Sequence, residues 1–191
     1  MTQSGPDSDP LFEEIPNGIC RKWIDLGSVF FLQDLFIVPE QLPGQNISLN
    51  LEADGTGSIG AGYDRTGQLH ISGGVKVESN FGYLGYKAGS SGTAFVVGEG
   101  SEWNNSDDLY VGKTGTGTLN VEAGGVVSNT YGYLSSLSGS TGEATVTGSG
   151  SQWNNSIRLF VGSYGTGTLN VEAGGVVSNT HGHIGFYDDS T

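Results

Sequence analysis

The sequence has little of three things that define large classes of protein: cysteine, basic residues and long apolar runs. Cys20 is the only cysteine among 191 residues, which excludes an intrachain disulfide and a cysteine-rich metal site. Seven Lys and Arg residues stand against twenty Asp and Glu residues, so the formal net charge is −13. Binding to nucleic acid or to an anionic membrane depends on clustered basic residues, and this composition argues against both.

The most apolar segment, residues 28–40, does not have the pattern of a membrane helix. Asp34 and Pro39 interrupt it, and it falls short of the roughly 20 apolar residues that cross a bilayer. It also lacks the pattern of a signal peptide, because no small-residue cleavage site follows it. We therefore expect no membrane span and recognise no secretion signal in this chain.

Glycine is abundant, with 34 residues, and it recurs at a fixed spacing. Residues 115–130 and 165–180 both read GTGTLNVEAGGVVSNT, fifty positions apart, and a shorter period of half that length lies beneath the repeat. The glycines on the shorter period are Gly67, Gly92, Gly117, Gly142 and Gly167. Three apolar columns follow it: Leu69, Ala94, Leu119, Ala144, Leu169; Ile71, Val96, Val121, Val146, Val171; and Ile59, Leu84, Leu109, Leu134, Leu159, Ile184.

Runs such as TLNV and ATVT alternate in polarity between Gly, Ser and Asn residues, which predicts short strands joined by turns. Strands that return every twenty-five positions favour a solenoid in which each coil pairs in parallel with the next. The predicted fold is therefore all-β, a parallel β-helix of about six coils from about residue 42. We divide it into residues 46–191 as repeats, in double-coil units 67–116 and 117–166 and a partial unit 167–191.

Strong identity at fifty positions predicts a unit of two unlike coils. The small residues Ala94 and Ala144 alternate with leucine, and their coils carry Trp103 and Trp153 in the segments EGSEWNNS and SGSQWNNS. Because protein cores hold a nearly constant packing density, we expect each tryptophan to restore the volume that the alanine of its coil gives up.

The repeat resembles a family found in autotransporter (type V secretion) passenger domains and in bacterial surface proteins with a PEP-CTERM sorting signal. The residues that carry the resemblance are Gly100, Ser101, Trp103, Leu109, Val111, Gly112, Gly117, Leu119, Val121, Gly124 and Gly125, with their counterparts fifty positions later. It spans residues 67–191 and implies a right-handed parallel β-helix that serves as a surface stalk or adhesin. It also implies a location at the cell surface or outside the cell.

The two ends of the predicted stack differ. Residues 1–10 are expected to be disordered, and residues 11–45 are apolar enough to cap the N-terminal coil. No cap-like segment follows the last repeat, where the sequence reads YDDST. We expect either a truncated array or further coils from a neighbouring chain, which would make end-to-end self-association a partner interaction.

The candidate site is an outward stripe of aromatic residues beside the predicted Leu84 column. One outward column reads Tyr83, Asp108, Tyr133, Arg158 and His183, and the other reads Gly85, Tyr110, Ser135, Phe160 and Gly185. The stripe is therefore predicted to zigzag through Tyr83, Tyr110, Tyr133, Phe160 and His183. It could stack sugars or dock a glycan or a surface protein of a host or neighbouring cell, since rings offer large area at low entropic cost. The alternative, which we favour, is packing of the rings on one another.

Other motifs favour structural interpretations. In WNNS, tryptophan is expected to fill the core and asparagine to form a turn, since it tolerates left-handed geometry and can hydrogen-bond its own backbone; carbohydrate binding is the alternative. His181 and His183 replace Tyr131 and Tyr133 of the preceding repeat, which favours aromatic replacement over a metal site. Asp107–Asp108 and Asp188–Asp189 favour solvated turns over a calcium site.

No pattern of nucleophile and base, phosphate loop or metal cluster is present, and only Asp108 and Arg158 share an outward column, with Tyr133 between them. Ordering of water by outward threonines is disfavoured because Glu143, Phe95 and His70 interrupt the array. We therefore predict no catalytic residues, no metal and no cofactor. The predicted role is a non-enzymatic structural or adhesive solenoid, with a carbohydrate-binding or carbohydrate-active β-helix as the alternative.

Overall fold

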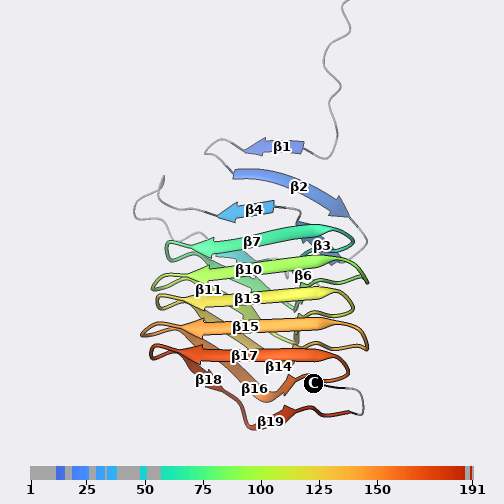
Figure 1. The fold of residues 1–191 in the computed structure, drawn as a ribbon. Helices are drawn as coiled ribbons and strands as arrows, with labels where there is room; N and C mark the ends of the chain where they lie inside the picture. Colours follow the sequence, from blue (N-terminus) through green and yellow to red (C-terminus); the bar gives the residue numbers. More distant parts are fainter. Residues whose placement is uncertain are drawn as a thin grey trace, which may run out of the picture.

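The protein folds into a stack of β-coils with no helix among the residues described by the computed structural model, which are 12–15, 19–25, 29–32, 34–37, 48–50, 57–187 and 190. Side chains are described from residue 57 onward. The chain winds through about five turns between residues 57 and 187, and each turn adds one layer to the stack (Figure 1). The parallel β-solenoid predicted from the sequence is confirmed, with about five turns rather than six. The predicted disordered segment, residues 1–10, lies outside the described residues.

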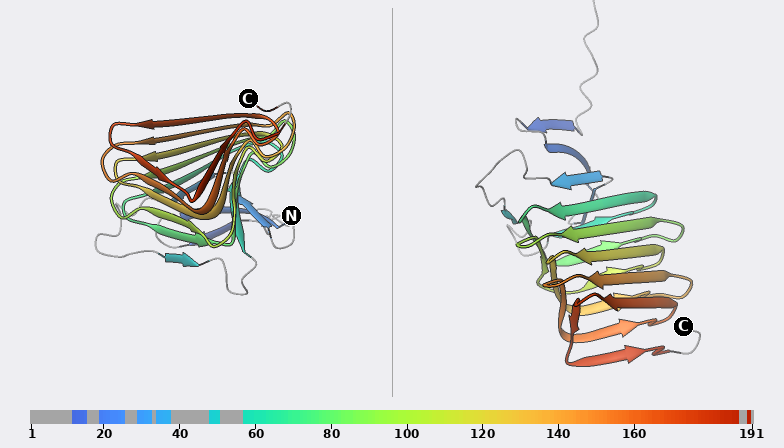
Figure 2. Two further views of the ribbon diagram at one scale, coloured as in Figure 1. Left: turned by 90° about the horizontal axis from the view of Figure 1, so that it is seen from below. Right: turned by 60° about the vertical axis from the view of Figure 1, so that its left-hand side comes forward.

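Two sheets form the sides of each coil. The front sheet consists of β7 (Thr66–Ser72), β10 (Ser91–Val97), β13 (Thr116–Glu122), β15 (Thr141–Thr147) and β17 (Thr166–Glu172), with β4 (Asp34–Ile37) beside β7. The bent sheet consists of β6 (Ser58–Ala61), β8 (Lys76–Ser79), β9 (Phe81–Leu84), β11 (Glu102–Asn105), β12 (Leu109–Val111), β14 (Val126–Leu134), β16 (Gln152–Val161), β18 (Val176–Ser178) and β19 (His181–Ile184). Viewed along the stack, the bent sheet turns sharply behind the straight front sheet (Figure 2).

Five strands precede the regular coils. They are β1 (Phe12–Ile15), β2 (Ile19–Asp25), β3 (Val29–Leu32), β4 and β5 (Ser48–Asn50). Strand β1 pairs antiparallel with β2, and β2 pairs antiparallel with β3, whereas β3, β4 and β5 add in parallel to β6, β7 and β8. These strands lie at the N-terminal end of the stack (Figure 1). The side chains on which the capping prediction depends lie outside the described residues.

The front sheet keeps the sequence period of twenty-five positions without interruption. Ala94 pairs with Leu69 on one side and with Leu119 on the other, and Val96 pairs with Ile71 and Val121. The same alignment continues through β15 and β17. Two of the three predicted apolar columns are therefore confirmed, since leucine and alanine alternate in one and β-branched residues fill the other.

The third predicted column is wrong, because the bent sheet departs from that regular period. Leu109 pairs with Gly82 and Gly132, whereas Val111 pairs with Leu84 and Leu134. The coil that contains Trp103 has two extra residues before β12, and the turn that follows β12 is two residues shorter. The number of positions between paired residues of successive coils is therefore alternately larger and smaller than twenty-five. The structure has two columns instead: Ile59, Gly82, Leu109, Gly132, Leu159, Gly182; and Ala61, Leu84, Val111, Leu134, Val161, Ile184.

These columns divide the repeats into two coil types. Residues 91–115 and 141–165 form the tryptophan coils, and residues 66–90, 116–140 and 166–187 form the glycine coils, named for Gly82, Gly132 and Gly182. Trp103 and Trp153 are fully buried. A Cβ atom on Gly82 would lie 2.8 Å from Trp103 Cζ2. The tryptophan therefore occupies the space left by a glycine of the preceding coil. It also lies in the same coil as the small alanine of the front sheet, as the sequence predicts.

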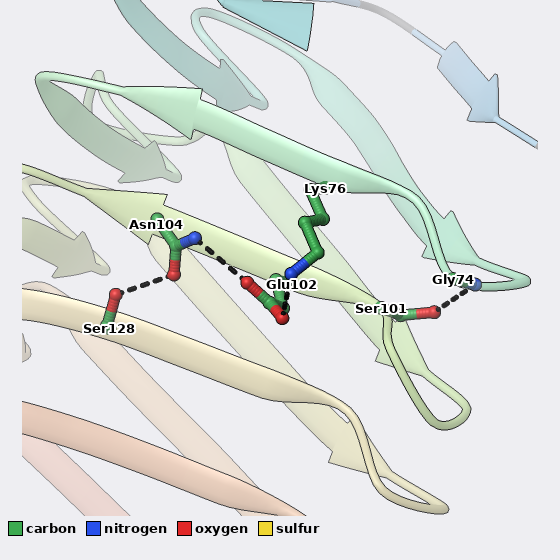
Figure 3. Close-up of polar contacts among 6 residues, drawn as sticks. All are labelled: Gly74, Lys76, Ser101, Glu102, Asn104 and Ser128. Atoms are coloured by element: carbon green, nitrogen blue, oxygen red, sulfur yellow. Dashed lines mark hydrogen bonds and ion pairs between the residues drawn. The ribbon is translucent and has the colours of Figure 1, made fainter. Parts of the chain in front are cut away.

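Serine and glycine form the sharp turn before each tryptophan. Ser101 Oγ accepts a hydrogen bond of 3.0 Å from the Gly74 amide of the preceding coil and donates one of 2.8 Å to the Val97 carbonyl. Gly100 adopts a φ of 79°, a left-handed conformation that favours glycine. Figure 3 shows this turn beside the outward polar contacts of β8 and β11. The G-S-x-W segment therefore links successive coils as well as turning the chain.

Candidate functional site

The predicted aromatic residues lie in one straight ladder on the outer face of the bent sheet. The ring centroids are 5.3 Å apart for Tyr83 and Tyr110, 4.9 Å for Tyr110 and Tyr133, 5.0 Å for Tyr133 and Phe160, and 4.8 Å for Phe160 and His183. Interplanar angles of 3° to 12° make each contact a parallel stack. We call these five residues the aromatic ladder. It is the arrangement in which cross-strand aromatic pairs stabilise a sheet.

The predicted zigzag is wrong for the same reason as the third apolar column. Tyr110 pairs directly with Tyr83 and Tyr133 because two extra residues precede it in its coil. The shift also moves Arg158, which pairs with Tyr131 and His181 rather than standing in the column of Tyr133. A strictly constant period could not reveal this, because the extra residues and the shorter turn cancel within one coil.

Neighbouring residues cover the two faces of most ladder rings. Tyr110 has Tyr83 on one face and Tyr133 on the other, and the exposed fractions of Tyr83 and Phe160 are 9% and 7%. Tyr86 packs edge-on against Tyr83, and Phe186 packs edge-on against Phe160 and His183. A sugar that stacks on a ring needs a free ring face. Within the ladder, mainly ring edges and hydroxyl groups remain for contacts with a ligand.

A lysine lies among three of the rings. The Lys113 Nζ atom is 4.6 Å from the ring centroid of Tyr83, 4.5 Å from that of Tyr86 and 5.2 Å from that of Tyr110. These are cation–π distances, and partial burial strengthens such contacts. Lys113 and Tyr86 were missed by the sequence analysis because both lie in the turns that follow the strands. Ser163 stands at the place of Lys113 one repeat later, so the contact is not repeated.

A carboxyl group adjoins the ladder. The Tyr110 hydroxyl donates a hydrogen bond of 3.0 Å to Asp108 Oδ2. Burial raises the pKa of Asp108 from 3.8 to about 6, with a further upward contribution from Asp107, although the hydrogen bond from Tyr110 opposes the shift. Burial also raises the pKa of Tyr83 to about 12 and raises the pKa of Tyr110, next to the Asp108 carboxylate. The tyrosine hydroxyl groups are therefore neutral at physiological pH.

The histidines do not converge on a common site. His183 stacks on Phe160 at the end of the ladder, as aromatic replacement of Tyr133 predicts, whereas His181 lies beside Arg158. In the described part of the chain, no group of three or more His, Cys, Asp and Glu residues is placed to hold a metal ion. Asp188 and Asp189 lie outside the described residues. Asp108 contacts Tyr110 rather than standing in a fully solvated turn.

The WNNS segments form a ladder of hydrogen bonds inside the bend. Trp153 Nε1 donates to Asn129 Oδ1 at 2.7 Å, and Asn129 Nδ2 donates to Asn155 Oδ1 at 2.7 Å. The preceding repeat uses Ser79 in place of Asn129, with distances of 3.3 Å from Trp103 Nε1 and 2.8 Å to Asn105 Oδ1. The expected left-handed asparagines are wrong, since Ala123, Ser135 and Ala173 are the non-glycine residues with positive φ among those described. Asn105 and Asn155 of the two WNNS segments instead accept hydrogen bonds from Ser79 and Asn129, the residues that also accept from the tryptophan indoles.

A shallow polar hollow of about 390 Å³ lies beside these hydrogen bonds and crosses four coils. It is lined by amide and hydroxyl residues: Asn105, Ser106, Ser128, Asn129, Thr130, Asn154, Asn155, Ser156 and Ser178. Ser128 Oγ donates to Asn104 Oδ1 at 2.7 Å, and Asn104 Nδ2 donates to Glu102, which pairs with Lys76 (Figure 3). Sugar binding by WNNS was one interpretation of the sequence, but this hollow was not predicted. The sequence feature that could have indicated the hollow is the recurrence of Ser and Asn at equivalent positions of consecutive coils.

Comparisons with family models, with curated proteins and with solved structures find no match for this chain. The resemblance to autotransporter and PEP-CTERM-associated repeats therefore depends on the repeat residues alone. None of the described residues forms a helix long and apolar enough to cross a membrane.

Proposed function

We propose that the protein is a non-enzymatic β-solenoid with a structural or adhesive role at the cell surface or outside the cell. The observation that carries this proposal is that side chains repeatedly join one coil to the next. The aromatic ladder does so on the outer face, the hydrogen bond from Asn129 to Asn155 does so at the bend, and Ser101 and Ser151 do so at the turns. Chains with such nearest-neighbour contacts form stiff rods whose length follows from the number of coils.

The chemistry of the ladder supports packing over catalysis. General acid–base catalysis requires a titratable group that can approach a substrate. Asp108 instead bonds with Tyr110, whose ring lies between two other tyrosines. Glu102 likewise contacts Lys76 and Asn104 on the outward face of the bent sheet. These polar groups serve contacts between or within coils.

Carbohydrate binding is a second candidate, and the polar hollow favours it. Amide and hydroxyl groups are suitable partners for sugar hydroxyls, since each can donate or accept hydrogen bonds. Ser106 and Ser156 line the hollow, one repeat apart, and are exposed. A glycan with a matching spacing, on a host cell or a neighbouring cell, is the corresponding partner. In this version of the proposal, the solenoid is an adhesin as well as a spacer.

Location is tested by treating intact source cells with protease and probing the protein with an antibody. We expect the protein on intact cells or in the medium, and its loss from intact cells on proteolysis. A cytoplasmic protein of known location serves as the control for cell integrity. A surface or extracellular role would be contradicted if the protein resists the protease until the cells are lysed and no protein is found in the medium.

Adhesion is tested on a glycan array with three proteins whose fold is checked by circular dichroism. They are the wild-type chain, Ser156→Tyr, which fills the hollow, and a triple variant with Tyr83, Tyr110 and Tyr133 changed to Phe, which keeps the ring stack. Selective binding that only Ser156→Tyr removes would assign recognition to the hollow. Binding lost in the triple variant would assign it to the ladder hydroxyls. No binding by the wild-type chain would favour the spacer role.

A further inference from the structure

No strand of the described residues lies over the C-terminal face of the stack, which is formed by β17, β18 and β19. Among the described residues, β17 pairs only with β15, whereas β18 and β19 pair only with β16. Val171 is 47% exposed and Ile184 is 86% exposed, although Val121 and Leu134 at the same places in the preceding glycine coil are fully buried. The face thus combines free strand edges with uncovered core side chains. Such edges accept an added strand from another polypeptide.

The internal coils show what covers a face of this type. Gly132 lies beneath Trp153 of the next coil, where a Cβ atom would be 2.9 Å from Cζ2, as Gly82 lies beneath Trp103. The same indole donates its Nε1 hydrogen to Asn129 of the glycine coil. Each tryptophan therefore uses two features of the preceding coil, a hollow over a glycine and a hydrogen-bond acceptor at the bend.

The last glycine coil offers both features uncovered. Gly182 stands at the place of Gly132, and Asn179 stands at the place of Asn129. Both residues are exposed. Among the described residues, a Cβ atom on Gly182 would have a single neighbour within 4 Å, the side-chain nitrogen Nδ2 of Asn179 at 3.3 Å. A Cβ atom on Gly132 would meet Asn155 and Leu159 as well as Trp153. The space that an indole fills twice within the stack is open here.

We propose that this face is a docking site for one β-coil of the tryptophan type, supplied by a polypeptide with the pattern of residues 141–165. Its strands extend the two sheets, its indole lies over Gly182, and its Nε1 hydrogen bonds with Asn179. A second folded copy does not present this ligand, because both tryptophan coils lie between glycine coils inside the stack. The proposal stands independently of the location and the glycan binding proposed above.

The first test measures binding of a fluorescein-labelled peptide of residues 141–165 to the full chain by fluorescence anisotropy. We expect saturable binding that weakens at least about 10-fold when Trp153→Ser is made in the peptide, because a buried tryptophan anchors such interfaces. Gly182→Leu in the chain is expected to weaken it at least as much. Gln68→Ala, exposed on the outward face of β7, is the matched surface control and should leave binding unchanged.

The second test avoids dependence on peptide solubility. A copy of residues 142–165 is added after Thr191, which stands at the Thr141 position and so keeps the repeat in register. Hydrogen exchange of β17 to β19 is expected to slow at least about 10-fold, and the same extension with its tryptophan changed to serine should protect much less. Absence of both peptide binding and protection would overturn the proposal, as would equal effects of the tryptophan and serine versions.

Self-association gives a distinct result in sedimentation experiments. If the chain forms a dimer that Gly182→Leu dissociates, and the peptide does not compete with it, the face is an interface between copies of this chain. That outcome would replace the tryptophan coil as the occupant. A monomer that binds the peptide supports the proposal.

Discussion

At the scale of single residues, three glycines decide where the tryptophans fit. Gly82, Gly132 and Gly182 occupy equivalent positions, and none has the positive φ that makes glycine necessary for the backbone. Gly132 is needed because a side chain there would enter the space of Trp153 and Asn155. Gly182 stands at the same place in its coil, with histidines in place of the flanking tyrosines, and no coil of the described residues lies over it. Glycine is therefore required at position 132, whereas we expect position 182 to accept a larger residue.

Gly132→Ala is expected to destabilise the protein by about 1–3 kcal/mol, because the added methyl group overpacks a filled core. The new Cβ would lie 2.2 Å from Asn155 Oδ1 before relaxation. Gly182→Ala is the matched control and should change the free energy of unfolding by less than about 0.5 kcal/mol. Urea unfolding followed by circular dichroism measures both. Equal effects of the two substitutions would show that the tryptophan hollow does not constrain Gly132.

Asp108→Asn is expected to stabilise the protein at neutral pH. Because the folded-state pKa of Asp108 is raised to about 6, the folded protein holds a proton that the unfolded chain releases near pH 4. The wild-type Asp108 therefore contributes less stability as pH rises from about 4 to above 6. The variant should gain about 1 kcal/mol at pH 7, a value reduced for partial solvent exposure, and almost nothing at pH 4.

Urea unfolding of wild type and Asp108→Asn at several pH values between 4 and 7.5 provides the measurement. The difference between the two proteins is the relevant quantity, since other carboxyl groups titrate in both. A difference that stays constant with pH would contradict the raised folded-state pKa of Asp108.

At the scale of elements, buried hydrogen bonds join the coils at the bend between the two arms of the bent sheet, where the pairing of β14 with β16 also shifts register between Asn129 and Tyr131. Asn129 in β14 accepts from Trp153 and donates to Asn155 in β16. Ser79 in β8 performs both roles for Trp103 and Asn105 of β11. Serine and asparagine are therefore interchangeable at this place, provided that a donor and an acceptor remain.

Asn129→Ala is expected to cost about 2–4 kcal/mol in the free energy of unfolding, because it leaves both the Trp153 N–H group and the Asn155 carbonyl oxygen without a partner. Asn129→Ser reproduces the arrangement of Ser79 and should cost less than about 1 kcal/mol. Chemical unfolding of the two variants distinguishes the effects. If serine costs as much as alanine, side-chain volume rather than hydrogen bonding is the requirement at this position.

At the scale of the whole molecule, stability is expected to vary along the stack because each coil contacts its neighbours only. Strands β13 and β17 have the same sequence, TGTLNVE, and therefore the same intrinsic amide exchange rates. Strand β13 lies between β10 and β15, whereas β15 is the one partner of β17 in the described part of the chain. The pair isolates the effect of position in the stack.

Hydrogen exchange of β17 is expected to be at least about 100-fold faster than that of β13 under native conditions, since the last coil opens without disrupting the rest. Mass spectrometry of the two segments at low protein concentration provides the measurement. Equal protection would show that the C-terminal face is covered in solution or that the stack unfolds as one unit.

Much of the architecture followed from the sequence alone. The period of twenty-five positions predicted the parallel solenoid, and two apolar columns of the front sheet were predicted residue by residue, because that sheet has neither insertions nor deletions. The aromatic residues of the ladder were also identified. These features are local and repeated, so each coil carries the same information about its place in the stack.

Only the tertiary structure decided how the bent sheet is aligned. Two extra residues before β12 and a correspondingly shorter turn after it leave the repeat length unchanged, so the period conceals the shift that places Tyr110 between Tyr83 and Tyr133. The tertiary structure also decided which of the repeated apolar residues are buried. Val121 and Val171 stand in identical sequences, yet one is fully buried and the other is 47% exposed. The physical reason is that a coil cannot bury its own apolar face and depends on the coil beside it.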